Sequence, residues 1–166
     1  MRRGLTALLL LLAATLAPAQ TVRRPAYSSS RLSSLAVAIG TAEGFGLRGA
    51  LPTRYHNPGD LKGKPDLFGA VRIGKGGHLV FKNDAAGKAA LQHQLELVLD
   101  GRSRHYTLDM TLEQMARRYA KNWRNWSRYV ARLLGVRPTV TLRDYLCEGD
   151  VDVAPVLQFP EVVRVY

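Results

Sequence analysis

The stretch AIGTAEGFGLRGALPTRYHNPGDLKG, residues 38–63, places a carboxylate in an unusual position. Ser30 is a suitable N-cap and Gly44 a suitable residue to stop a helix, so we predict a helix over residues 31–43. Glu43 closes this helix and falls on the side of four apolar residues at helical spacing, Leu32, Leu35, Ala36 and Ile39. The sequence therefore puts a charge on the apolar side of a helix end.

Two physical effects raise the pKa of a carboxyl group placed like Glu43. Loss of hydration among apolar side chains disfavours the charged form, and the unpaired carbonyls at the C-terminal end of a helix disfavour an anion. Arg48 and Arg54 are close enough in sequence to pair with Glu43 and lower its pKa instead. The simpler alternative is that Glu43 points into water. A raised pKa would suit Glu43 to act as a general acid.

Turn signals and helical periodicity divide the rest of the chain into short elements. Asn57-Pro58-Gly59-Asp60 is a strong turn signal within a structured loop over residues 44–64. Gly74-Lys75-Gly76-Gly77 separates two apolar runs, 67–73 and 78–81, and predicts a β-hairpin. Four helices are expected after the hairpin. The first covers residues 84–99, with Asn83 or Asp84 as its cap, and the second begins at a capping box of Thr111 and Gln114. The third covers residues 125–134, and the fourth begins at Thr141.

The N-terminus has the features of a secretory signal peptide. Arg2 and Arg3 precede a short apolar run, and small residues end at Ala19, so we expect a signal peptide over residues 1–19. The run is shorter than the roughly 20 residues that span a bilayer, although an uncleaved anchor is the alternative. A linker over residues 20–30 would follow, and the protein would be secreted or periplasmic.

The net charge indicates an anionic partner. It is +11 for the whole chain and +9 without Arg2 and Arg3. Zinc-finger spacing, an Arg-rich helix and RNA-binding aromatic signatures are absent from the sequence, so we do not predict nucleic acid as the partner. For an exported protein, the expected electrostatic contact is with the anionic cell envelope.

Cysteine and histidine usage argues against disulfides and metal sites. Cys147 is the only cysteine, so it can pair only with another chain or serve as a small buried apolar residue. The four histidines lack the helical pairing with acidic residues that is typical of zinc sites. We therefore expect no metal and no organic cofactor.

Three motifs resemble those of a known group of proteins. They are the helix ending in Glu43-Gly44, the loop Asn57-Pro58-Gly59-Asp60-Leu61 preceded by Arg54, and the segment Phe81-x5-Gly87-x-x-Ala90-Leu91. Their order and spacing, over residues 32–136, resemble the lysozyme-like and transglycosylase-like proteins of bacteria and phage structural components. The resemblance implies a lysozyme-like domain over residues 31–146, of α+β class, mainly helical with a small β-hairpin. It leaves open the structure of the tail over residues 147–166.

The resemblance also implies a function and a set of site residues. Glu43 would be the catalytic acid of a peptidoglycan-cleaving enzyme, and the activity expected is lytic transglycosylase-type cleavage of the MurNAc-GlcNAc β-1,4 bond in glycan strands by a monomer. The expected substrate-binding residues are Arg54, His56, Asn57, Gly59, Asp60 and Tyr119. The group has asparagines where this chain has His56 and Asp60.

Several alternatives remain open from the sequence. Asp60 is either a turn residue or the second carboxylate of a hydrolase, and Tyr119 either orients Glu43 or a sugar, or belongs to the core. Trp123 and Trp126 either stack on sugars or pack inward. At the level of the whole protein, the alternatives are a non-catalytic glycan-binding or structural module with the same fold, and a basic exported protein that binds nucleic acid or anionic lipid.

Overall fold

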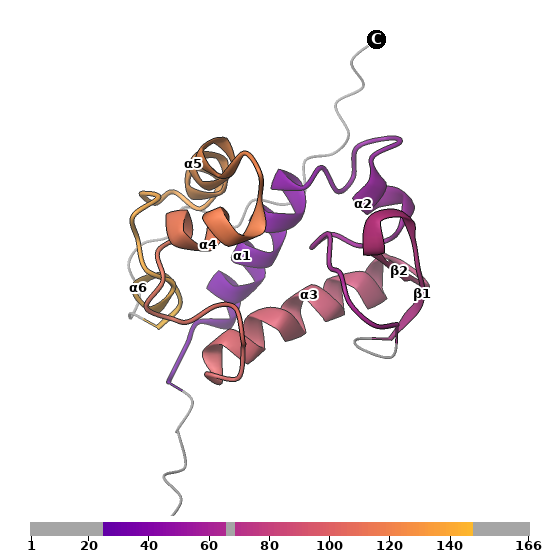
Figure 1. The fold of residues 1–166 in the computed structure, drawn as a ribbon. Coiled ribbons are helices and arrows are strands. Elements are labelled where there is room, and N and C mark those ends of the chain that lie inside the picture. Colours follow the sequence, from indigo (N-terminus) through magenta and orange to yellow (C-terminus); the bar gives the residue numbers. More distant parts are fainter. Residues whose placement is uncertain (1–24, 66–68, 148–166) are drawn as a thin grey trace, which may run out of the picture.

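A computed structural model describes residues 25–65 and 69–147, so the expected signal peptide and all of the tail except Cys147 lie outside the described residues. In the described part, helices predominate over a single two-stranded antiparallel sheet, which gives an α+β domain (Figure 1). The elements are α1 Ser29–Ala42, α2 Leu51–Arg54, β1 Ala70–Ile73, a 3-10 turn η1 Lys75–Gly77, β2 Leu79–Phe81, α3 Asp84–Leu99, α4 Leu112–Tyr119, α5 Trp123–Leu133 and α6 Leu142–Cys147.

The first helix, α1, ends where the sequence predicts and begins slightly earlier. Its N-cap is Ser28, whose side chain accepts a hydrogen bond from the backbone N–H of Arg31, so the cap expected at Ser30 lies inside the helix. Glu43 is the C-cap, and Gly44 follows with a φ of 81°, a conformation that glycine adopts without strain. The helix therefore stops at the carboxylate, as expected.

The main core lies between α1 and the helices that follow the hairpin. In the predicted apolar stripe of α1, Leu32, Leu35 and Ile39 are buried and Ala36 is partly buried. The helix packs on α3 and α5 (Figure 1). The capping box at Thr111 and Gln114 is present at the start of α4. None of the helices in the described residues has the length and apolar character needed to cross a membrane.

The hairpin is smaller than the predicted one and has its own core. In the register of the two strands, Ala70 lies opposite Phe81 and Ile73 lies opposite Leu79, with an irregularity between Ala70 and Arg72. Leu79 and Phe81 are buried with Ala90 of α3, so the hairpin is attached to the N-terminal part of that helix. The segment 66–68, in which the first predicted strand begins, is outside the described residues.

The Asn-Pro-Gly loop is held between α1 and α3. A Cβ atom at Gly87 of α3 would lie 1.7 Å from the carbonyl oxygen of His56, and one at Gly40 of α1 would lie 3.2 Å from the Cβ of Pro58. Both helices therefore approach the loop at positions without a side chain. This contact gives a physical reason for the glycine in the Phe81-x5-Gly87 segment.

Candidate active site

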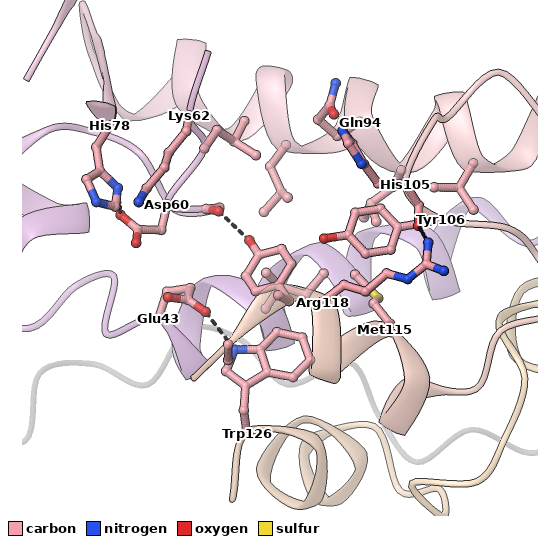
Figure 2. A pocket seen from close by; sticks show the side chains of 18 of the residues that line it. Glu43, Asp60, Lys62, His78, Gln94, His105, Tyr106, Met115, Arg118 and Trp126 are labelled. Carbon is pink, nitrogen blue, oxygen red and sulfur yellow. Dashed lines mark hydrogen bonds and ion pairs between the residues drawn. The ribbon is translucent and has the colours of Figure 1, made fainter. Parts of the chain in front are cut away.

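A cleft of about 760 Å³ opens where α1 ends, and it is walled by the Asn-Pro-Gly loop, α3, α4 and α5 (Figure 2). Ile39, Leu91 and Leu95 supply apolar surface from α1 and α3. The polar side chains that line it include Glu43, Asp60, Lys62, His78, Tyr106 and Arg118. Parts of the chain that are far apart in the sequence therefore contribute to one site.

Glu43 lies half-buried in this cleft, and among the described residues one side chain donates a hydrogen bond to it. The indole Nε1 of Trp126 donates to its Oε1 atom at 2.6 Å (Figure 2). In the part of the chain that the structure describes, neither Arg48 nor Arg54 forms an ion pair with Glu43. The sequence left open whether burial or an arginine would dominate the pKa of Glu43, and within the described residues no ion pair with Arg48 or Arg54 opposes the effect of burial.

The pKa of the Glu43 carboxyl group is raised above its ordinary value. Burial is the largest cause, because desolvation penalises the charged form, and the negative charge of Asp60 acts in the same direction. The hydrogen bond from Trp126 opposes both, since it stabilises the carboxylate. Glu43 therefore keeps its proton to higher pH than an ordinary glutamic acid does, which is the direction of shift that a general acid needs.

Replacing Trp126 by Phe is expected to raise the pKa of Glu43 further. The substitution keeps most of the buried ring but removes the N–H that stabilises the anion. A pH titration of the Glu43 carboxyl carbon by NMR should show its midpoint moving to higher pH. A midpoint that stays fixed or falls would show that this hydrogen bond does not hold the carboxylate.

Asp60 lies across the cleft in a constrained loop position. Its φ of 46° is in the left-handed region, which Asp tolerates better than most residues. Its Oδ1 atom is 2.6 Å from Nδ1 of His78, and the two groups form an ion pair when His78 is protonated, although they are not oriented as an aligned hydrogen bond. Asp60 thus occupies a turn position beside His78, and its negative charge also acts on Glu43.

Tyr119 joins the Asn-Pro-Gly loop to the aromatic side of the cleft. Its hydroxyl group donates to the carbonyl oxygen of Gly59, and its ring centroid is 5.0 Å from that of Trp126. Burial, followed by the nearby charge of Glu43, raises the pKa of Tyr119 well above its ordinary value. Tyr119 therefore stays protonated. The ring centroid of Tyr106 lies 6.5 Å from that of Tyr119, so Tyr106 extends the aromatic surface along the cleft.

The structure brings four of the expected site residues to the cleft: Glu43, Gly59, Asp60 and Tyr119. Arg54 is exposed at the end of α2, and the Nδ1 atom of His56 lies 2.6 Å from Oδ1 of Asp84, so neither residue lines the cleft. Their expected contact with substrate does not fit these positions.

The expectation that Asn57 touches the glycan also does not fit the structure. Asn57 is fully buried, where its side-chain amide donates to the carbonyl oxygens of Leu61 and Leu79 and its Oδ1 accepts from the N–H of Leu61. All three bonds tie the loop to itself and to β2. Asn57 therefore shapes the loop that presents Gly59 and Asp60, and it lies behind the cleft surface.

Sequence reasoning did not identify the partner of Glu43. Trp126 is 7% exposed and donates to the carboxylate, so it packs inward. The guanidinium groups of Arg117 and Arg124 lie over the Trp123 ring, at 4.2 and 4.4 Å from its centroid. One signal was available: a buried indole N–H needs an acceptor. Its pairing with a residue 83 positions away required the fold.

Across residues 25–65 and 69–147, no group of three or more His, Cys, Asp or Glu side chains is arranged to hold a metal ion. Cys147 is partly exposed, and burial raises the pKa of its thiol. Comparison of the chain with family models, curated proteins and solved structures finds no match.

Proposed function

We propose that this protein is an exported, lysozyme-like enzyme that cleaves the MurNAc-GlcNAc β-1,4 bond of peptidoglycan, with Glu43 as its general acid. The observation that carries the proposal is the position of Glu43: a carboxyl group of raised pKa, held by Trp126, in the wall of an open cleft. The aromatic surface of Tyr106 and Tyr119 along the same cleft suits the apolar faces of sugar rings.

In this mechanism protonated Glu43 donates its proton to the glycosidic oxygen as the bond from that oxygen to the anomeric carbon breaks. The Glu43 carboxylate then takes a proton from the 6-hydroxyl of the muramic acid residue, whose oxygen closes onto the anomeric carbon. The product is a 1,6-anhydro sugar, and Glu43 regains its proton. One carboxyl group is enough for this route, and the contact of Asp60 with His78 and its turn geometry support a structural role for the second acid.

Digestion of purified peptidoglycan followed by mass spectrometry of the muropeptides tests the proposal. We expect anhydro ends from the wild-type protein. Reducing ends would indicate hydrolysis, with water attacking the anomeric carbon and Asp60 as the candidate second carboxylate. Binding to peptidoglycan without any cleavage product would contradict the proposal and favour a non-catalytic glycan-binding module.

Asp60→Asn is expected to retain most of the activity and to change its pH dependence. Asn also tolerates the left-handed backbone, so the turn should survive. Because the negative charge of Asp60 helps to raise the pKa of Glu43, its removal should lower that pKa. The decline of kcat/KM at rising pH should therefore occur at lower pH than in the wild type. An activity loss as large as that of a Glu43 variant would instead make Asp60 a catalytic residue.

A further inference from the structure

The positive charges in the cleft outnumber the negative charges that balance them. Lys62, Arg118 and Lys121 line the cleft, and in the described residues none of the three forms an ion pair with a carboxylate. Of the two acids in the lining, Asp60 lies against His78 and Glu43 has a raised pKa. The cleft is therefore an electropositive environment for a ligand.

Arg118 is the cation whose position is best defined. Its Nη1 atom donates to the backbone carbonyl of His105, which fixes the guanidinium group against the loop between α3 and α4. A guanidinium has five N–H donors, and within the described residues this bond is the only one that Arg118 makes. The remaining N–H donors form a fork suited to a carboxylate. The Arg118 side chain is exposed, and its bond to the His105 carbonyl holds it in place.

The place of Arg118 in the cleft separates it from the proposed chemistry. Figure 2 shows its side chain running past the Tyr106 ring toward the His105 end of the cleft, whereas Glu43 and Asp60 lie toward the other end. Burial raises the pKa of Tyr106, which stays protonated and keeps its hydroxyl as a donor beside this cation. The two ends of the cleft thus have different chemistry.

We propose that the Arg118 end of the cleft is a subsite for a carboxylate carried by the glycan, so that the cleft prefers acidic glycan chains to neutral chains of the same length. This inference deepens the proposed function and rests on it for the identity of the ligand as a glycan. In this proposal Arg118 binds the ligand, and its subsite is separate from the glycosidic bond that is cleaved at Glu43. The lactyl carboxylate of a muramic acid residue that carries no stem peptide is a ligand of the required chemistry.

Calorimetric titration of the Glu43→Gln protein with two matched ligands tests this subsite. One ligand is a GlcNAc-MurNAc tetrasaccharide with free lactyl carboxylates, and the other is the same tetrasaccharide with these groups converted to amides. We expect the acidic ligand to bind about tenfold more tightly. This factor is at the lower end of the range for hydrogen bonds to charged groups, because Arg118 is exposed. The preference should shrink in high salt, because exposed charges are screened.

Substitutions on α4 locate the preference. Arg118→Gln should remove it and leave binding of the amidated ligand within about twofold, whereas Arg118→Lys should retain part of it. Arg117→Gln is the matched control, because Arg117 pairs with Glu113 and stacks on Trp123 outside the cleft. Thermal unfolding of each variant would show whether the domain remains folded.

Each result has a defined meaning. Equal binding of the two ligands, no binding of either, or an unchanged preference in Arg118→Gln would overturn the subsite. If the preference depends on Arg118 but the wild-type protein releases no muropeptides, the proposed cleavage fails and the subsite stands. If muropeptides are released and the preference does not depend on Arg118, the cleavage stands and the subsite fails.

Discussion

Glu43→Gln is expected to lower the turnover of peptidoglycan by about 10²–10⁴-fold, the range that a positioned general acid contributes. The fold should be retained, because the amide has the size of the carboxyl group and its oxygen still accepts the hydrogen bond from Nε1 of Trp126. Rates of muropeptide release, measured beside the thermal unfolding curve of the same preparation, separate loss of chemistry from loss of structure.

Glu113→Gln provides the control for this measurement. It makes the same chemical change on α4, where Glu113 pairs with Arg117 at the protein surface. Exposed ion pairs contribute about 0–1 kcal/mol, so stability and turnover should both stay close to wild type. If Glu43→Gln had turnover similar to that of this control, Glu43 would have no part in the mechanism.

Gly87→Ala is expected to have the largest effect on stability. The new methyl group would lie 1.7 Å from the carbonyl oxygen of His56, so either α3 or the Asn-Pro-Gly loop must move. Overpacking against backbone reaches the upper end of the usual range, about 3 kcal/mol or more. Thermal unfolding should show Tm falling by about 10 °C or more, and activity should fall with it because the loop carries Gly59 and Asp60 into the cleft.

Gly40→Ala is the matched comparison on the other helix that contacts the loop. Its methyl group would lie 3.2 Å from the Cβ of Pro58, a tight contact that small shifts relieve. The gain of about 1 kcal/mol in helix propensity offsets this strain, so Tm should change little. Equal destabilisation by the two substitutions would show that close packing at Gly87 does not hold the loop.

The sequence alone was sufficient for features that depend on local chemistry. The apolar stripe of α1, its end at Glu43, the hairpin around the Gly74–Gly77 turn and the capping box at Thr111 all follow from residue type and spacing within about one or two turns of chain. The tendency of Glu43 toward a raised pKa was also predictable, because apolar neighbours and a helix C-terminus both act locally.

Only the tertiary structure decided which distant groups meet. The choice of Trp126 rather than Arg48 or Arg54 as the partner of Glu43, and the burial of Asn57 behind the cleft, depend on packing between elements far apart in the chain. Hydrogen-bond partners across such distances are set by how helices approach one another, and no local pattern encodes them. The sequence thus determined that a carboxylate would close the first helix, and the packing of α5 and the Asn-Pro-Gly loop around it determined its environment.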